Sequence, residues 1–351
     1  MKNYIIGLNG IRALAVFLVI ISHRFPENHI LQSFPLGAYG VDVFFVLSGF
    51  LISRGLFFQL NSKEMIFAQK VKILKNFFIN RSLRIFPIYY LLLLFLFLTK
   101  GIIGNDFREN ILWYLFYGAN YLNYNQNKWF GSLGHLWSLS VEEQFYILFP
   151  LLLVFVFRRK IFIFLIILII SGTLYPFFMD GKSGILTLSC INAFGIGGLF
   201  AYLEVYKKNY VSGFYKWTFF LSIPILILLI VHNLYSSIPF FPERLAISVL
   251  AIHIIALCYL KPNSFVVNKI FNNKFLNFVG IISYGVYLYH NIVPKYWNFI
   301  LSKLNVFSIL NSNTEFSYIE FLLQTAFIII LSYFSWIVIE KPILKFKKHT
   351  L

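Results

Sequence analysis

The chain has 351 residues, of which 59% are hydrophobic, 20% aromatic and only 12% charged. A soluble domain of this size carries about a quarter charged residues and leaves a large surface facing water, so this composition excludes a soluble globular protein. The net charge of +17 would suit nucleic acid in a soluble protein. Here the basic residues lie between apolar segments, which favours a role in membrane topology over nucleic-acid binding.

Ten segments are predicted to be membrane-spanning helices, because each approaches the roughly 20 apolar residues that such a helix needs. In chain order they cover residues 8–24, 37–57, 84–100, 141–157, 161–178, 185–205, 215–232, 243–260, 279–299 and 319–340. The first is interpreted as a retained helix rather than a signal peptide, because no small-x-small cleavage site follows it. A shorter apolar stretch, Ile111–Leu122, is predicted to be re-entrant or interfacial.

The Lys and Arg residues predict how these helices are oriented. With the N-terminus in the cytoplasm, most of the 30 Lys and Arg residues fall in cytoplasmic segments, as the positive-inside rule requires. We therefore expect an all-α integral membrane protein of about ten helices with both termini in the cytoplasm. Residues 1–351 are expected to form a single membrane domain. One basic cytoplasmic loop is expected at about residues 59–80, with no soluble domain.

Ionisable side chains at membrane depth are costly and are functional candidates. Arg12 and His23 are eleven residues apart, so on a helix they share a face and lie about 16 Å apart along the axis. Imidazole is the usual general base near neutral pH, which makes His23 a candidate catalytic residue. From spacing alone, an equal alternative is that the Arg12 side chain snorkels and that His23 simply lies at the membrane surface.

Asp42 lies in the first turns of the second predicted helix. A carboxylate there favours the helix dipole, but it could also orient a catalytic histidine through a hydrogen bond. Ser48 and Gly49, further along, are expected to allow close approach of another helix.

Arg81 and Arg84 end the predicted basic loop. Three residues apart on a helix, their guanidinium groups point the same way, and paired guanidinium groups bind phosphate well. The alternative, favoured by charge alone, is an anchor to lipid headgroups.

Two carboxylates, Glu142 and Glu143, begin the fourth predicted helix. Ser140 and Glu143 match a capping box, which would explain Glu143 and leave Glu142 unexplained. Either carboxylate could position a base or bind substrate hydroxyl groups.

A second group of polar and aromatic residues is predicted to line a substrate path. Ser283, Tyr287 and His290 fall close to one face of the ninth predicted helix, and His135 and Trp137 stand at the entrance of the fourth. Hydrogen bonding between helices is an alternative role for Ser283, Tyr287 and His290.

These motifs, taken in order, resemble acyltransferase family 3, the bacterial integral-membrane O-acyltransferases. The resemblance spans nearly the whole chain. Because the chain ends soon after its last predicted helix, it resembles the standalone form without an SGNH esterase-like domain. The motifs that carry the resemblance are Arg12-x(10)-His23, Gly40–Phe50, Arg81-x-x-Arg84-Ile85-Phe86-Pro87, Trp137–Tyr146, Ser283–His290 and Glu340-Lys341-Pro342.

The resemblance implies transfer of an acyl group, usually acetyl, from cytoplasmic acyl-coenzyme A to a hydroxyl of a cell-surface or lipid-linked glycan. Carried over by position, His23 would be the catalytic histidine and Arg12 its essential partner. Arg81 and Arg84 would bind the phosphates of coenzyme A, with Arg12 also assigned to the acyl-coenzyme A site.

The remaining expectations follow from the same resemblance. Asp42, Glu142 or Glu143 would orient the imidazole or hold the acceptor. Acetyl-coenzyme A is expected as a co-substrate rather than a permanently bound cofactor, and no metal is expected. The expected location is the bacterial cytoplasmic (inner) membrane, with membrane lipids as neighbours and a homo-oligomer left open.

A transporter of a lipid-linked sugar or small metabolite is the alternative function. Intramembrane His, Asp and Glu side chains could serve as a proton relay. The chain lacks the repeat symmetry that many transporters show, and a transporter would leave the Arg81–Arg84 pair unexplained.

Overall fold

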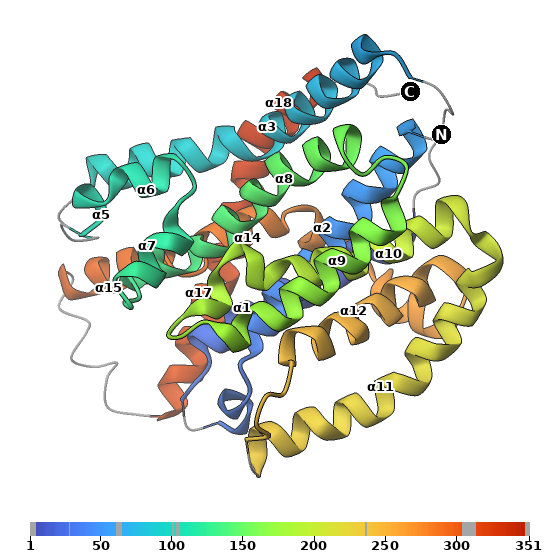
Figure 1. Cartoon of the computed structure of the whole chain (residues 1–351). Helices are drawn as coiled ribbons and strands as arrows, with labels where there is room; N and C mark the ends of the chain where they lie inside the picture. Colours follow the sequence, from blue (N-terminus) through green and yellow to red (C-terminus); the bar gives the residue numbers. More distant parts are fainter. Residues whose placement is uncertain are drawn as a thin grey trace.

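The computed structural model describes residues 5–27, 29–60, 65–99, 102, 106–235, 237–303 and 314–347, and the side chains of the last range from residue 318 onward. Every regular element in these ranges is helical. Eight of the helices found there are long and apolar enough to cross a membrane. The chain is therefore an all-α, multi-pass membrane protein, as predicted, and Figure 1 shows its long helices lying roughly along one another.

Most predicted spans correspond to one long helix each. The long helices are α1 (Leu8–Arg24), α2 (Leu36–Leu60), α3 (Phe67–Leu98), α8 (Trp137–Phe155), α9 (Ile161–Leu174), α10 (Thr187–Tyr206), α11 (Val211–Leu234), α12 (Glu243–Leu260) and α17 (Thr314–Ser335). Helices α1 and α12 have the bounds that their spans predict, and several others differ by only a few residues.

The long basic loop predicted at residues 59–80 is wrong. Helix α2 continues to Leu60 and α3 begins at Phe67, so most of the predicted loop belongs to α3. Apolar residues continue through this segment, and Leu74 is buried. A hydropathy window ends a span where lysines appear, whereas a helix can continue past the membrane surface with its lysines in water.

The predicted span at residues 279–299 is also wrong as a single helix. The chain forms three short helices there, α13 (Lys274–Ile281), α14 (Ser283–Tyr289) and α15 (Val293–Lys303). Pro294, in the first turn of α15, has no N–H to donate to the carbonyl of His290, and in a continuous helix its ring would clash with that carbonyl, which accounts for the second interruption. As a result His290 lies at the end of a helix rather than in the middle of one.

The stretch Ile111–Leu122 is divided between two short helices, α6 (Ile111–Leu115) and α7 (Ala119–Asn125). Hydroxyl groups of α3 hold α6 in place, since Tyr89 donates to the carbonyl of Tyr114 at 2.8 Å and Tyr90 donates to the carbonyl of Leu115 at 3.0 Å.

Helices α2 and α10 approach each other at two glycines. A Cβ on Gly49 would lie 2.2 Å from the carbonyl oxygen of Phe194, and a Cβ on Gly197 would lie 2.1 Å from that of Val46. Neither distance allows a side chain, so the close approach predicted for Gly49 is confirmed. This contact fixes α2, which forms one wall of the site described next.

Candidate active site

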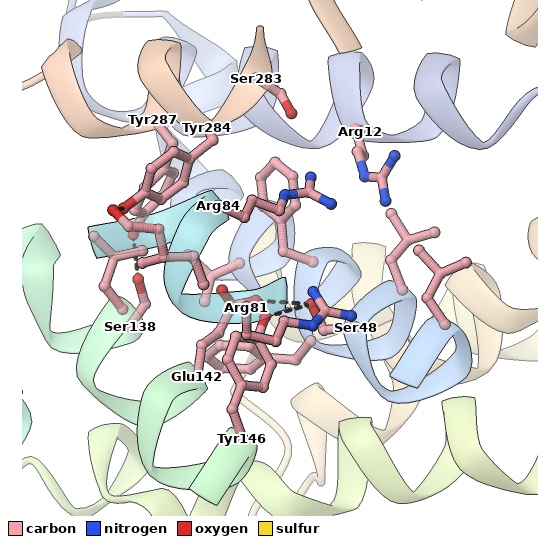
Figure 2. A pocket seen from close by; sticks show the side chains of 17 residues that line it. Arg12, Ser48, Arg81, Arg84, Ser138, Glu142, Tyr146, Ser283, Tyr284 and Tyr287 are labelled. Atoms are coloured by element: carbon pink, nitrogen blue, oxygen red, sulfur yellow. Dashed lines mark hydrogen bonds between the residues drawn. The ribbon is translucent and has the colours of Figure 1, made fainter. Parts of the chain in front are cut away.

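One pocket brings together residues from five helices (Figure 2). Helix α1 contributes Arg12, and α3 contributes Arg81 and Arg84. The other walls come from α2, α8 and α14. The remaining polar or aromatic lining residues of these three helices are Phe44, Phe45, Ser48, Ser138, Glu142, Tyr146, Ser283, Tyr284 and Tyr287.

Three guanidinium groups face this pocket from two helices. In Figure 2 the groups of Arg81 and Arg84 extend toward the same side of the pocket as Arg12. The Arg81 group lies 5.1 Å from the centre of the Tyr146 ring, so an aromatic face supports it. Among the described residues neither Arg81 nor Arg84 has a hydrogen-bond partner, which leaves their N–H groups for an anionic ligand.

Lys347, directly after the 3-10 turn Leu344–Phe346, adds another positive charge here. Burial, together with repulsion by Arg84, Arg81 and Arg12, lowers the pKa of Lys347 to about 8. The three arginines act on Lys347 because its ammonium group lies near them. Sequence reasoning missed this residue, since a basic chain end was interpreted only as a sign of topology.

Glu142 lies in the pocket beside the arginines. Ser48 donates a hydrogen bond of 2.9 Å to its Oε1, and the Tyr146 hydroxyl lies 3.2 Å from the Ser48 hydroxyl. Ser48 was expected to serve helix packing, but it lines the pocket and holds this carboxylate. Glu142 therefore belongs with the arginines and not with His23.

Glu143 is buried, and its Oε1 has no hydrogen-bond partner among the described residues. The predicted capping box is wrong, because α8 begins at Trp137 and Ser140 lies inside the helix. The Ser140 hydroxyl instead donates to the carbonyl of Leu136 and accepts from the N–H of Ala119.

Three histidines form a second cluster. The ring centres of His23 and His290 are 5.2 Å apart, and those of His135 and His290 are 4.7 Å apart. His23 is exposed at the end of α1, whereas His135 and His290 are buried. The structure thus joins the candidate catalytic histidine to two residues that were predicted for a substrate path.

Tyr287 connects the pocket to the histidine cluster. Its hydroxyl lies 2.5 Å from that of Ser138 and donates to the carbonyl of His135, while its ring centre is 5.3 Å from that of His290. Ser283, on the same short helix, also lines the pocket. Trp137 packs edge-on against Phe45, which itself faces the pocket.

Asp42 lies apart from the histidines. Its Oδ1 accepts a hydrogen bond of 2.6 Å from Nε of Arg244 on α12, and Nη1 of Arg244 donates to the carbonyl of Ser189. The structure therefore gives Asp42 an arginine partner, not the imidazole that the sequence suggested.

Comparison with known proteins identifies the family of the chain. Residues 5–341 match the family model of the acyltransferase domain. The protein named "Putative O-acetyltransferase SACOL0978", from Staphylococcus aureus strain COL, is 33% identical over 84% of this chain and 51% of its own length. "O-acetyltransferase OatA" of S. aureus strain NCTC 8325 is 35% identical over 45% of this chain and 26% of its own.

The chain spans about half the length of the curated relatives that it matches over most of its own. No solved structure matches it. The family match nevertheless covers both the arginine-lined pocket and all three histidines. This chain therefore belongs to the acyltransferase family.

Proposed function

We propose that the protein transfers an acetyl group from cytoplasmic acetyl-coenzyme A to a hydroxyl of a cell-surface glycan or its lipid-linked precursor, in the bacterial cytoplasmic membrane. The names of the relatives support acetyl as the group transferred. The observation that carries the proposal is the gathering of Arg12, Arg81 and Arg84 around one pocket.

The charges of the pocket support a phosphorylated donor. Coenzyme A carries a pyrophosphate and a 3′-phosphate, and guanidinium groups bind such oxyanions with charge-assisted hydrogen bonds. Lys347 adds to the positive charge. The positive-inside rule assigns this end of the bundle to the cytoplasm, where acyl-coenzyme A is found.

The histidines support the transfer step. With the phosphates at the arginines, the pantetheine arm would extend past Ser138 and Tyr287 toward His23, over the roughly 16 Å that separate Arg12 from His23 along α1. His23 takes the proton as the acceptor hydroxyl attacks the thioester carbonyl. The new C–O bond forms, the C–S bond breaks, and the thiolate leaves and regains a proton. The apolar walls limit hydrolysis of the thioester by water.

The donor site is tested by measuring coenzyme A binding to purified protein. Replacing Arg81 and Arg84 together by alanine should weaken binding by about 100-fold, since charge-assisted hydrogen bonds contribute about 1.5–3 kcal/mol each. The matched control is Lys207→Ala with Lys208→Ala, which removes two positive charges between α10 and α11, away from the pocket lining. Equal effects of the two pairs would make Arg81 and Arg84 topological anchors.

The transfer itself is tested with radiolabelled acetyl-coenzyme A and membrane glycan acceptors. His23→Ala should abolish transfer while coenzyme A binding persists. Absence of transfer by the unaltered protein, or transfer that survives His23→Ala, would contradict the proposal. Mass spectrometry of surface glycans from cells with and without the protein then identifies the acceptor.

A further inference from the structure

His290 lies between the other two histidines and, unlike His23, is fully buried. It is 0% exposed, and its ring lies within 5.2 Å of His23 and 4.7 Å of His135, centre to centre. The acceptor substrate can reach His23, which is exposed, but cannot reach His290. Any part that His290 plays in the reaction must therefore act through His23.

The hydrogen bonds of His290 determine which of its nitrogens carries the proton. Its Nδ1 lies 2.5 Å from the carbonyl oxygen of Tyr287. A carbonyl oxygen only accepts, so Nδ1 donates, and in the neutral ring Nε2 then carries a lone pair. Among the described residues this buried Nε2 has no hydrogen-bond partner, although an unsatisfied buried acceptor destabilises a fold.

The neighbouring groups leave His290 as the candidate partner for His23. His135 has a backbone carbonyl at each ring nitrogen, that of Ser132 at 2.9 Å and that of Leu288 at 3.3 Å. The lone pair of its neutral ring therefore faces a carbonyl oxygen and not an N–H of His23. Asp42 is bonded to Arg244. Arg24, which is bonded to Asn291 at 2.5 Å, carries donors and cannot accept.

We propose that His290 is the positioning residue of His23, on the basis of the acyl transfer proposed above. In the reacting enzyme the lone pair on Nε2 of His290, which has no partner among the described residues, accepts a hydrogen bond from one ring nitrogen of His23. This leaves the other nitrogen of His23 unprotonated and directed at the acceptor hydroxyl. When that hydroxyl loses its proton to His23, the imidazolium formed keeps its hydrogen bond to His290. The proton stays on His23, and His290 remains neutral throughout.

This arrangement replaces a carboxylate by a neutral acceptor behind the base. A carboxylate behind a histidine orients the ring and stabilises the imidazolium. An imidazole lone pair orients the ring in the same way without placing a negative charge beside the hydrocarbon, where charge is costly.

The first test compares two substitutions of the positioning residue. His290→Leu removes the acceptor at similar volume, whereas His290→Gln places an amide oxygen near the position of Nε2. We expect His290→Leu to lower kcat for acetyl transfer by about 10- to 100-fold, with KM for acetyl-coenzyme A unchanged, and His290→Gln to recover part of the loss. His253→Leu on α12, outside the cluster, is the matched histidine control and should retain activity.

The second test needs neither donor nor acceptor. Diethylpyrocarbonate acylates exposed, unprotonated imidazole, and mass spectrometry locates the product. His23 should react several-fold more slowly in His290→Leu than in the unaltered protein, and at an intermediate rate in His290→Gln. If the unaltered protein transfers no acetyl group, the proposed function fails while this second measurement still decides the role of His290. Unchanged reactivity of His23 in His290→Leu would overturn the positioning role.

Discussion

Asp42 and Glu142 are both carboxylates on long helices of the bundle, and their partners differ in kind. Asp42 is paired with Arg244, whereas Glu142 accepts from the neutral hydroxyl of Ser48 and lies near Arg81. Sequence spacing could place Arg12 and His23 on one face, because both belong to the same helix. It could not pair Asp42 with Arg244 or His23 with His290, because these contacts depend on how distant helices pack.

The ion pair of Asp42 predicts a stability effect. Asp42→Ala leaves the Arg244 charge without its partner between α2 and α12, and should destabilise the protein by about 3–5 kcal/mol. Thermal denaturation in detergent measures the loss. Replacing both residues, as Asp42→Leu with Arg244→Met, should recover most of the stability, since no charge is then left unpaired. A stable but inactive Asp42→Ala protein would instead favour a catalytic role.

The lowered pKa of Lys347 predicts a pH dependence of donor binding. A bound phosphate raises this pKa above its free value of about 8, so affinity for coenzyme A should fall as the pH rises above about 8. Lys347→Met should weaken binding at pH 7 by about threefold, the magnitude typical of a partly exposed charge, and should remove this pH dependence. Desulfo-coenzyme A, which lacks the titrating thiol, is the probe for calorimetry.

Lys347→Arg provides the control for the charge itself. Arginine stays protonated over the whole range, so this variant should bind at pH 9 as tightly as at pH 7. A decline in affinity of the same size in all three proteins would assign the titration to another group.

At the scale of elements, the length of the apolar runs predicted most helices. It failed where a helix continues through charged residues. Helix α12 has the predicted bounds, because its apolar run ends abruptly at Lys261. Helix α3 begins well before its predicted start, because the lysines of its first turns end a hydropathy window without ending the helix. The interruption that places His290 after α14 has a clear sequence signal in Pro294, which the hydropathy of residues 279–299 overrode.

The contact between α2 and α10 predicts a contrast between two glycines on one helix. Gly49→Ala should destabilise the protein by about 1–3 kcal/mol through overpacking, because its Cβ would meet the backbone of Phe194. Gly55→Ala should be neutral or slightly stabilising, since nothing lies within 4 Å of its Cβ and alanine favours a helix. Melting temperatures in the same detergent compare the two, and equal midpoints would contradict the packing.

At the scale of the whole molecule, the proposed reaction requires that the histidine end and the arginine end face opposite compartments. Glu27, after α1, and Lys72, early in α3, are both exposed and lie outside the site. In intact cells a membrane-impermeant maleimide should label Glu27→Cys and spare Lys72→Cys, which should react only after lysis. The native Cys190 and Cys258 are buried, so the unaltered protein gives the background. The reverse pattern would invert the orientation.

The hydroxyl pair of Ser138 and Tyr287 lies where the arginine-lined pocket adjoins the histidines. A bacterial membrane stores energy as a proton gradient, and a continuous file of water through the bundle would dissipate it. The tyrosine hydroxyl is engaged by Ser138 and by the carbonyl of His135, so it does not serve as a free site for a water in such a file. In the proposed reaction the pantetheine arm itself fills the opening between Ser138 and Tyr287 through which it passes, so water does not. The proposed transfer would thus deliver an acetyl group to the far side of the membrane without making the protein a proton conductor.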